Sequence, residues 1–382
     1  MRIAQISPLY ESVPPKLYGG TERVVHFLTE ALIDLGHEVT LFASGDSETR
    51  AELVPCAPTA LRLSGVVDPI APHVAMMEEV FARPNDFDVL HFHTDYLGYS
   101  LARRHPVPYL TTMHGRLDTP ELEPIFRTFP DAPLVSISDA QREPHAEANW
   151  LGTVYHGLPV DLYHLVPQTG KYLAFVGRIS PEKRVDRAVE IARRVGMPLK
   201  IAAKVGAQDR DYFEAEIKHL FDDPLVEYVG EIGEDEKNAF LGGAAALLFP
   251  IDWPEPFGLV MIEAMACGTP VVAFRRGSVP EVMRDSEAGF VVDTLDEAVA
   301  ATERAVGLSR AGVRAYFEKR FTATRMAREY VAIFEGMVES ARLRRGRGRT
   351  AFGLAAIDAD DHDSDGARAV DGLGGEAGVG ME

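Results

Sequence analysis

The chain has 382 residues, which is more than one ordinary domain holds, and 46% of them are hydrophobic, enough for two cores. A formal net charge of -19 argues against sequence-independent binding to nucleic acid and weakly against a strongly anionic membrane partner. The cysteines, Cys56 and Cys267, are far apart and have no metal-ligand spacing, which predicts reduced thiols in a cytoplasmic protein. No apolar run approaches the ~20 residues that span a bilayer, and we expect no transmembrane segment.

The first half of the chain alternates short apolar strands with helical segments. The start of the chain, at 2–7, has the pattern of a strand and not of a signal peptide. This alternation predicts a parallel, doubly wound sheet in a first domain over residues 1–163. The predicted strands are 2–7, 38–43, 88–93, 107–114, 133–138 and 154–156, and the predicted helices are 24–35, 96–104 and 140–150.

The same alternation restarts after a weak stretch around 159–170. We therefore predict a second α/β domain over residues 164–325, followed by a helix over 326–342. The predicted strands are 172–176, 199–205, 226–230, 245–251, 271–274 and 290–292, and the predicted helices are 181–195, 211–221, 235–241, 258–266 and 295–308.

The end of the chain has a different composition. Residues 342–349 are rich in Arg, and residues 357–382 are rich in Asp, Gly and Ala with few large apolar groups. Such a composition predicts a disordered tail over 343–382. The aspartates at 358, 360, 363 and 365 lack the spacing and the bidentate Glu of a calcium-binding loop, which favours a solvated acidic tail.

Two carboxylates frame the most informative segment. Glu255 follows the predicted strand 245–251 in a Pro-rich loop, whereas Glu263 lies in the first turns of a nearly all-apolar helix. A buried Glu needs a basic partner or a polar ligand, and the helix N-terminus between the two attracts phosphate. A nucleotide-sugar, with hydroxyls on both sides of a diphosphate, would suit this layout. Alternatively, Glu263 pairs with a neighbouring Arg and Glu255 is a solvated loop residue.

Further polar groups follow other predicted strands, where ligands bind in parallel α/β sheets. Gly19 and Gly20 would let the backbone approach a phosphate, although paired glycines more often mark a turn. The absence of G-x-G-x-x-G and Walker A sequences argues against a dehydrogenase and a P-loop nucleotidase. Arg178 and Lys183 would suit a diphosphate leaving group, with a solvated helix start as the alternative.

Histidines follow two of the predicted strands in the first domain. His114 could donate a hydrogen bond to a substrate oxygen, although a lone His is more often structural. His91 and His93 share one face of a strand. We favour packing or an acceptor contact for this pair, because the sequence supplies no third ligand for a metal, and we predict no metal site.

Taken in order, these motifs resemble the retaining glycosyltransferases of family 4, which have the GT-B architecture. The resemblance covers most of residues 1–340 and includes the segments 264–271 and 277–281. It implies two Rossmann-like domains facing across a cleft, with the second domain holding most of the donor. The last helix, 326–342, would return to the first domain. The motifs are Gly19-Gly20-Thr21-Glu22, His114-Gly115, Gly177-Arg178 with Lys183, and the E-x7-E pair Glu255 and Glu263.

The resemblance also implies roles for these residues. Glu263 would bind the ribose hydroxyls, Arg178 and Lys183 the diphosphate, and His114 would lie near the reacting sugar. The backbone of Gly20 would reach the donor from across the cleft. The catalytic residues are then expected to be Glu255, His114, Arg178 and Lys183. The donor-binding residues are expected to be Gly19, Gly20, Arg178, Lys183, Glu255, Phe257, Gly258, Leu259 and Glu263.

The predicted function is therefore retaining transfer of a hexose from a UDP-, GDP- or ADP-sugar, by a front-face mechanism without metal or cofactor. The acceptor would be a small molecule, a saccharide or a lipid-linked compound, so peripheral membrane contact stays open. The sequence departs from the family at Lys204, where the family commonly has a Gly-rich strand end, and it lacks a convincing basic amphipathic helix in the first domain. The alternatives are a GT-B nucleotide-sugar epimerase and a non-catalytic nucleotide-sugar-binding protein.

Overall fold

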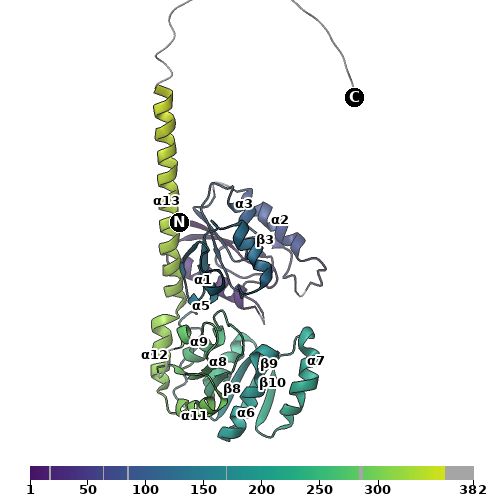
Figure 1. The fold of residues 1–382 in the computed structure, drawn as a ribbon. Helices are drawn as coiled ribbons and strands as arrows, with labels where there is room; N and C mark the ends of the chain where they lie inside the picture. Colours follow the sequence, from purple (N-terminus) through teal and green to yellow (C-terminus); the bar gives the residue numbers. More distant parts are fainter. Residues whose placement is uncertain (17–18, 63, 84–85, 169, 284–286, 358–382) are drawn as a thin grey trace, which may run out of the picture. The chain divides into compact units, whose positions relative to one another are not determined.

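The computed structural model describes residues 1–357 apart from 17–18, 63, 84–85, 169 and 284–286, with side chains described to residue 344. The chain divides into two compact units, Met1–Val338 and Glu339–Glu382. The first unit contains two separate parallel sheets, as Figure 1 shows. The α/β class with two parallel-sheet domains is therefore confirmed.

The first sheet has seven strands in the order β3-β2-β1-β4-β5-β6-β7, all parallel. The strand order reverses between β1 and β4, and such a switch point is where ligands bind in open α/β sheets. The strands are β1 (Arg2–Ile6), β2 (Glu38–Ser44), β3 (Glu52–Ala57), β4 (Val89–Phe92), β5 (Tyr109–Thr112), β6 (Leu134–Ser136) and β7 (Trp150–Thr153). The helices are α1 (Gly20–Asp34), α2 (Ile70–Phe81), α3 (Tyr99–Ala102), η1 (Pro120–Leu122), α4 (Glu123–Thr128), α5 (Asp139–Arg142) and η2 (Glu143–His145).

The second sheet has six parallel strands in the order β10-β9-β8-β11-β12-β13. Its strands are β8 (Tyr172–Arg178), β9 (Leu199–Lys204), β10 (Val226–Gly230), β11 (Ala244–Phe249), β12 (Val271–Phe274) and β13 (Gly289–Val292). Its short helical turns are η3 (Pro181–Lys183), η4 (Ala207–Asp209), α7 (Arg210–Tyr212), η5 (Phe213–Ile217), η6 (Lys218–Asp222) and α10 (Val279–Val282). Its longer helices are α6 (Val185–Val195), α8 (Glu234–Gly242), α9 (Leu259–Ala266), α11 (Leu295–Ala305) and α12 (Arg310–Arg320).

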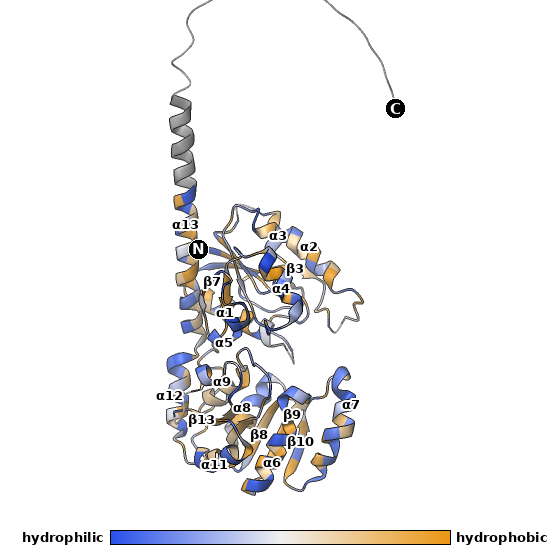
Figure 2. Ribbon diagram, viewed as in Figure 1, coloured by the Kyte–Doolittle hydropathy of each residue, from blue (hydrophilic) through white to orange (hydrophobic). Residues whose placement is uncertain are grey.

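The burial of strand β11 shows that this sheet is covered on both faces. All six of its residues are buried, and successive side chains point to opposite faces. Ala246 and Leu248 belong to the core that includes residues of α6 and α11, whereas Leu247 and Phe249 pack with the residues of α9. Figure 2 shows the corresponding pattern, with hydrophobic strands between helices whose outer faces are hydrophilic.

Helix α13 (Ala323–Ile357) packs on the first sheet near its start. The rings of Tyr330 and Phe334 lie 4.8 and 5.3 Å from the ring of His91. The helix continues past residue 342 to Ile357, where we had predicted disorder from residue 343. Arg, Leu and Ala are good helix formers, and extending a formed helix is easier than starting one, so the glycines at 346 and 348 do not end it. The rest of the predicted tail, 358–382, lies outside the described residues.

Several elements of the first domain differ from the sequence predictions. Strand β3 was not predicted, because Pro55 weakens a strand pattern; it is an edge strand, where Pro is tolerated. Helix α2 was also missed. The predicted helix 140–150 is only the short turns α5 and η2, and the closing strand is β7, not 154–156. In the second domain, helix α12 was missed.

Arg310 is a buried charge that the sequence did not single out. It is 5% exposed, although it is the first residue of α12. Its guanidinium donates to the carbonyl oxygens of Val166 (2.5 Å), Gly242 and Ala244 (both 2.8 Å), and to Thr269 Oγ1 (2.6 Å). Burial lowers the pKa of Arg310. This one side chain therefore satisfies several carbonyl groups beside the second sheet, at places where secondary structure does not pair them.

We predict that Arg310→Met lowers the free energy of unfolding by about 3 kcal/mol, because it leaves several buried carbonyl oxygens without donors. Urea unfolding of the whole chain measures this. Lys319→Met is the matched control: it lies on the exposed side of the same helix and should change stability by less than ~0.5 kcal/mol. Equal stability of the two variants would contradict the role of Arg310.

Candidate functional site

The predicted site residues lie where strands end. His114 follows β5 in the first sheet, Arg178 is the last residue of β8, and Lys183 ends η3 just beyond it. Glu255 follows β11, and Glu263 lies within α9. In parallel sheets all these positions belong to the carboxyl edge, where ligands bind.

Lys183 and Glu255 form a close ion pair. Lys183 Nζ lies 2.6 Å from Glu255 Oε2, and Trp253 Nε1 donates to the same oxygen at 3.0 Å. Lys183 Nζ also lies 4.6 Å from the centre of the Trp253 ring. Glu255 is only 8% exposed, so it is not the solvated loop residue of the alternative interpretation.

Glu263 is 3% exposed and has a basic partner. Its Oε1 accepts a hydrogen bond from Lys237 Nζ at 2.8 Å. The partner is therefore a Lys on α8 and not the Arg of the alternative interpretation. Burial lowers the pKa of Lys237, and the neighbouring Glu263 carboxylate opposes that change.

The N-terminus of α9 lies between the two carboxylates. Gly258 precedes the helix with φ at 79° and no side-chain cap, so no cap side chain occupies the first N–H groups. The positive φ at Gly258 disfavours other residues, and a Cβ there would also lie 2.8 Å from Met261 Cε. A Cβ at Gly20 would lie 3.6 Å from Leu259 Cδ1, which places the Gly19-Gly20 turn opposite the start of α9.

Arg178 is held by two carboxylates. Its Nη2 lies 2.6 Å from Glu182 Oε1 and its Nε lies 3.3 Å from Asp209 Oδ2. Its side chain remains 34% exposed, so the guanidinium is oriented yet accessible to a ligand. Lys204, the unusual residue at the end of β9, pairs with Arg178 in the strand register and lies 3.8 Å from Glu231 Oε2.

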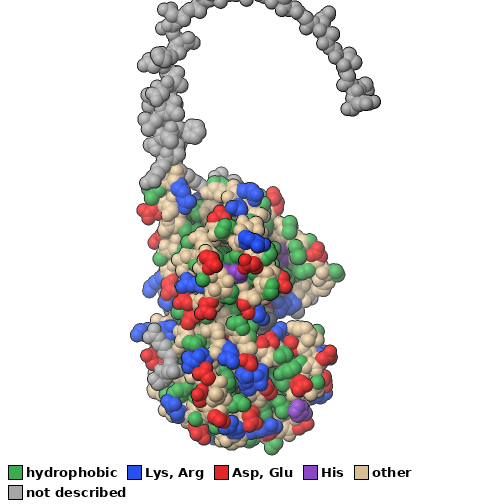
Figure 3. Space-filling view, viewed as in Figure 1, with side chains coloured by type: hydrophobic (Ala, Val, Ile, Leu, Met, Phe, Trp, Pro, Cys, Tyr) green, Lys and Arg blue, Asp and Glu red, His purple; other side chains and the backbone are tan. Residues whose placement is uncertain are grey.

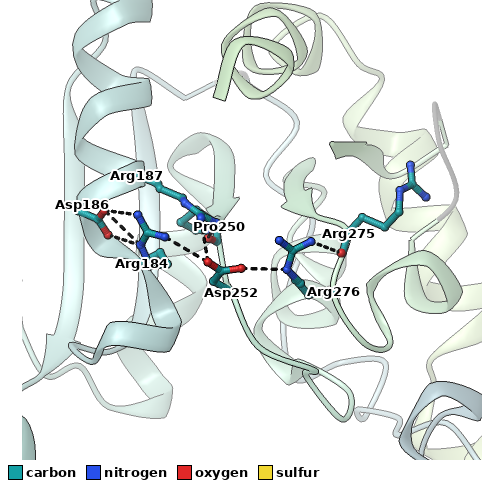
Figure 4. A network of polar contacts seen from close by, with 7 residues as sticks. All are labelled: Arg184, Asp186, Arg187, Pro250, Asp252, Arg275 and Arg276. Carbon is teal, nitrogen blue, oxygen red and sulfur yellow. Dashed lines mark hydrogen bonds and ion pairs between the residues drawn. The ribbon is translucent and has the colours of Figure 1, made fainter. Parts of the chain in front are cut away.

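Asp252 connects the loops that carry Lys183 and Glu255. Its carboxylate contacts Arg184 (3.2 Å), Arg187 (2.9 Å) and Arg276 (3.0 Å), as Figure 4 shows. Its backbone N–H also donates to Glu182 O at 2.8 Å. Partial burial raises the pKa of Asp252, but the three arginines, Arg276 first, reverse this effect and lower it. The network therefore fixes η3 against the loop after β11.

His114 lies in a cluster of neutral histidines. Its Nε2 is 2.8 Å from His93 Nδ1, and its ring stacks on that of His156 at 5.4 Å. The ring of His156 in turn contacts Phe257, 4.8 Å away in the segment of Glu255. Burial lowers the pKa of His114 to about 3. His91 Nε2 bonds Thr112 Oγ1 at 2.8 Å, so His91 and His93 serve packing and hydrogen bonding.

Two charged contacts that were not predicted from the sequence join the two domains. Glu281 accepts hydrogen bonds from the N–H groups of Asp139 and Ala140, both at 2.7 Å, and from Tyr155 OH at 3.1 Å. Arg23, on α1, pairs with Glu234 on α8. Glu281 ends the recognised segment 277–281 and Arg23 follows the recognised segment 19–22, but the role of each depends on which groups the fold brings opposite it.

Other features of the surface bear on the ligand. A cavity of about 610 Å³ lies beside η3, lined by Glu182, Arg184, Tyr212 and Asp252 among others, and none of the predicted site residues lines it. Among the described residues, no group of three or more His, Cys, Asp or Glu could hold a metal ion. On the face of the molecule that Figure 3 shows, basic and acidic side chains are intermixed and do not form one large basic patch.

Comparison with known proteins identifies two family models. Residues 163–308 match "Glycosyl transferases group 1", and residues 18–149 match "Glycosyltransferase Family 4". A D-inositol 3-phosphate glycosyltransferase of Streptomyces scabiei is 26% identical over 60% of this chain, and the match spans 62% of that relative's length. A phosphatidyl-myo-inositol mannosyltransferase of Mycobacterium leprae is 27% identical over 79% of this chain and 86% of the relative.

Solved structures share the fold. AviGT4, a glycosyltransferase involved in avilamycin A biosynthesis, has a TM-score of 0.68 and 25% identity over 89% of this chain and 98% of its own. HepE of Anabaena, crystallised with UDP and glucose, has a TM-score of 0.69 and 16% identity over 88% of this chain and all of its own. Within the described part of the chain, no helix has the length and apolar character needed to cross a bilayer.

The Glu263–Lys237 pair gives a stability prediction. Lys237→Met should lower the free energy of unfolding by about 3–5 kcal/mol at pH 7, because it leaves a buried carboxylate without its cation. The double variant Lys237→Met/Glu263→Leu should recover most of that loss, since it removes both charges and keeps the volume. Urea unfolding of the single and double variants measures the coupling. A double variant as unstable as Lys237→Met would show that the pair is not the cause.

Proposed function

The chain belongs to family 4 of the glycosyltransferases and has the GT-B fold, and on this premise we propose that it transfers a hexose from a nucleotide diphosphate sugar to an acceptor hydroxyl. We further propose that the anomeric configuration is retained and that neither a metal nor a cofactor takes part. The observation that carries the proposal is the Lys183–Glu255 pair beside the uncapped start of α9, with Arg178 at the end of β8, the strand next to β11.

The diphosphate would bind where positive groups converge. Arg178 presents a planar fork and Lys183 a point charge, and the uncapped N–H groups at the start of α9 add a third site for oxygen. The Gly19-Gly20 turn lies opposite and has no side chain to obstruct the phosphates. These groups would supply the stabilisation that a metal ion provides in other phosphate sites.

The two carboxylates would bind the ends of the donor. Glu263, within α9, would accept hydrogen bonds from the ribose hydroxyls, with Lys237 holding its carboxylate in place. Glu255 and the backbone N–H groups of Phe257, Gly258 and Leu259 would bind the sugar and its phosphate. His114 would face the same sugar from the first domain.

The reaction would proceed on one face of the sugar. The bond between the anomeric carbon and the leaving phosphate oxygen breaks while the acceptor oxygen forms the new bond on the same side. The acceptor proton passes to the leaving phosphate oxygen, whose growing charge Arg178 and Lys183 stabilise. Glu255 already holds Lys183 and Trp253, so we assign it sugar and cation positioning rather than covalent attack.

For the acceptor we propose chemical classes rather than one compound. The relatives' names include both a soluble inositol phosphate and a phosphatidyl-inositol acceptor, so a saccharide, a small polyol and a lipid-linked compound all remain candidates. We also propose a cytoplasmic location, which the two free cysteines support: Cys267 is buried and Cys56 is half-buried.

A donor screen tests the proposal. Purified protein with UDP-, GDP- or ADP-hexose near 100 times its Kd should gain about 2.7 kcal/mol of stability from the matching donor. That donor should also be slowly hydrolysed, equally with and without EDTA. Activity lost in EDTA would contradict metal independence, and an inverted anomer seen by NMR would contradict retention. An epimeric sugar nucleotide formed without acceptor would favour the epimerase, and no stabilisation by any donor would contradict the site.

Lys183→Ala tests the leaving-group role. We expect kcat to fall roughly 10²–10³-fold with the fold intact, because the variant loses one charge that stabilises the transition state. Steady-state kinetics with saturating donor, together with circular dichroism, measure both properties. Lys218→Ala, an exposed Lys paired with Glu214 on the same domain, is the control and should keep normal kcat. Near-normal turnover in Lys183→Ala would remove the assigned role.

A further inference from the structure

The cavity beside η3 is large enough for a ligand of its own. Its volume is about 610 Å³, within the range of roughly 300–1,000 Å³ of small-molecule sites. It lies between η3 with the start of α6, the segment α7–η5, and the loop after β11. Its polar lining residues are Glu182, Arg184, Asp186, Tyr212, Glu216 and Asp252. The residues assigned to the donor are not among them, so a donor bound as proposed would leave this cavity free.

The charges around the cavity balance. Four carboxylates line it, and ion pairs bring four guanidinium groups against three of them, partly drawn in Figure 4. These pairs are Arg178 with Glu182, Arg184 with Asp186, and Arg184, Arg187 and Arg276 with Asp252. An anion and a cation would each be repelled as well as attracted there. The net charge therefore favours a neutral ligand.

The lining can both donate and accept hydrogen bonds. Arg184 donates to Asp186 through Nε (2.9 Å) and Nη2 (2.7 Å), and to Asp252 through Nη1 (3.2 Å). Among the described contacts, these bonds occupy three of its five N–H groups and leave two for a ligand. In the described part of the chain, the Tyr212 hydroxyl and the Glu216 carboxylate have no hydrogen-bond or ion partner. Burial raises the pKa of Tyr212, so its hydroxyl stays protonated.

A ligand with several hydroxyl groups matches this lining. A hydroxyl both donates and accepts, whereas a carboxylate only accepts and an ammonium group only donates. Pro181, Tyr212 and Ile217 add apolar surface, which the C–H face of a sugar ring can cover. No group of three or more His, Cys, Asp or Glu among the described residues could hold a metal ion instead. The chemistry therefore indicates a neutral saccharide.

The segments that line the cavity also carry the predicted site. Lys183 lies between the lining residues Glu182 and Arg184. Asp252, another lining residue, precedes Glu255 in the loop after β11. The N–H group of Asp252 donates to Glu182 O at 2.8 Å, which fixes the two segments to each other. A ligand in the cavity would thus lie beside the sugar and diphosphate of the donor.

The first domain approaches the same loop. Arg116 and Asp118, just after the His114 motif, line a smaller cavity together with Pro254 and Glu255. The contact with Asp118 raises the pKa of Arg116, and the charge of Glu182 on the second domain adds to that rise. The large cavity therefore lies near the domain boundary, where the acceptor hydroxyl has to meet the donor sugar.

We propose that the cavity is a saccharide subsite, which holds a neutral sugar ring of the acceptor next to the ring whose hydroxyl receives the hexose. Hydroxyl groups of this ring would bridge Arg184 and Asp186 on one side and bind Tyr212 and Glu216 on the other. The inference rests on the proposed function. It narrows the acceptor to a saccharide of two or more rings, free or lipid-linked.

Binding can be tested without any donor. The fluorescently labelled full chain is applied to a glycan array that carries neutral, acidic and amino-containing oligosaccharides, and each binder is then titrated by calorimetry. We expect binding of neutral glycans with two or more rings. Selective binding of acidic or amino-containing glycans would overturn the ligand class, and binding of no glycan would overturn the site.

A double variant locates the binding. Tyr212→Phe/Glu216→Gln removes one hydroxyl and one charge at partly or fully exposed positions, so we expect an unchanged circular dichroism spectrum. It should weaken glycan binding roughly tenfold, because two hydrogen bonds to the ligand are lost or weakened. Glu214→Gln is the matched control: Glu214 lies in the same helical segment, pairs with Lys218 and does not line the cavity. Equal affinity of the double variant and the control would overturn the proposal.

Kinetics connect the subsite with transfer. With the glycan found on the array as acceptor, the double variant should raise the acceptor KM roughly tenfold and change kcat much less. An acceptor shortened by its distal ring should have a high KM in wild type and the same KM in the double variant. An acceptor KM that the double variant leaves unchanged would overturn the subsite alone. Glycan binding without transfer from any sugar nucleotide would instead contradict the proposed function and leave a saccharide-binding site.

Discussion

Lys183 and Glu255 lie 2.6 Å apart with little solvent around them, so each charge depends on the other. A lone carboxylate at that depth would be costly, and so would a lone ammonium group. The pair can form only if η3 and the loop after β11 hold a fixed distance. Asp252 provides this constraint through its three arginines and its backbone bond to Glu182, and all of these contacts lie within one domain.

The two domains contribute different kinds of polar groups to the site. In the second domain the cations of the predicted site have carboxylates close by, as Lys183 has Glu255 and Arg178 has Glu182. In the first domain the titratable groups packed around His114 are histidines, and burial keeps them uncharged. In the proposed complex a diphosphate would meet charged groups on one side, and the sugar would meet neutral hydrogen-bonding groups on the other. This division suits a donor whose charge lies in its phosphates and whose sugar is neutral.

The sequence predicted those features that depend on local pattern. The apolar run over 245–251 predicted a strand, and the position of Glu263 in an apolar helix predicted a buried carboxylate that needs a partner. The identity of the partner, Lys237, could not be predicted, because α8 and α9 meet only in the folded chain. Arg310 was missed for the same reason: its hydrogen-bond partners are 41 to 144 residues away.

The ion pairs of the site would let a diphosphate bind with little rearrangement. Arg178 is oriented by Glu182 and Asp209, and Lys183 by Glu255, so in the proposed complex phosphate oxygens would replace carboxylate oxygens around cations that are already in place. Groups that need little reorganisation stabilise a developing charge better than flexible ones. The carboxylates that remain nearby would then repel the departing diphosphate and favour its release after the proposed transfer. The acidic residues around Arg178 and Lys183 would thus contribute to turnover as well as to folding.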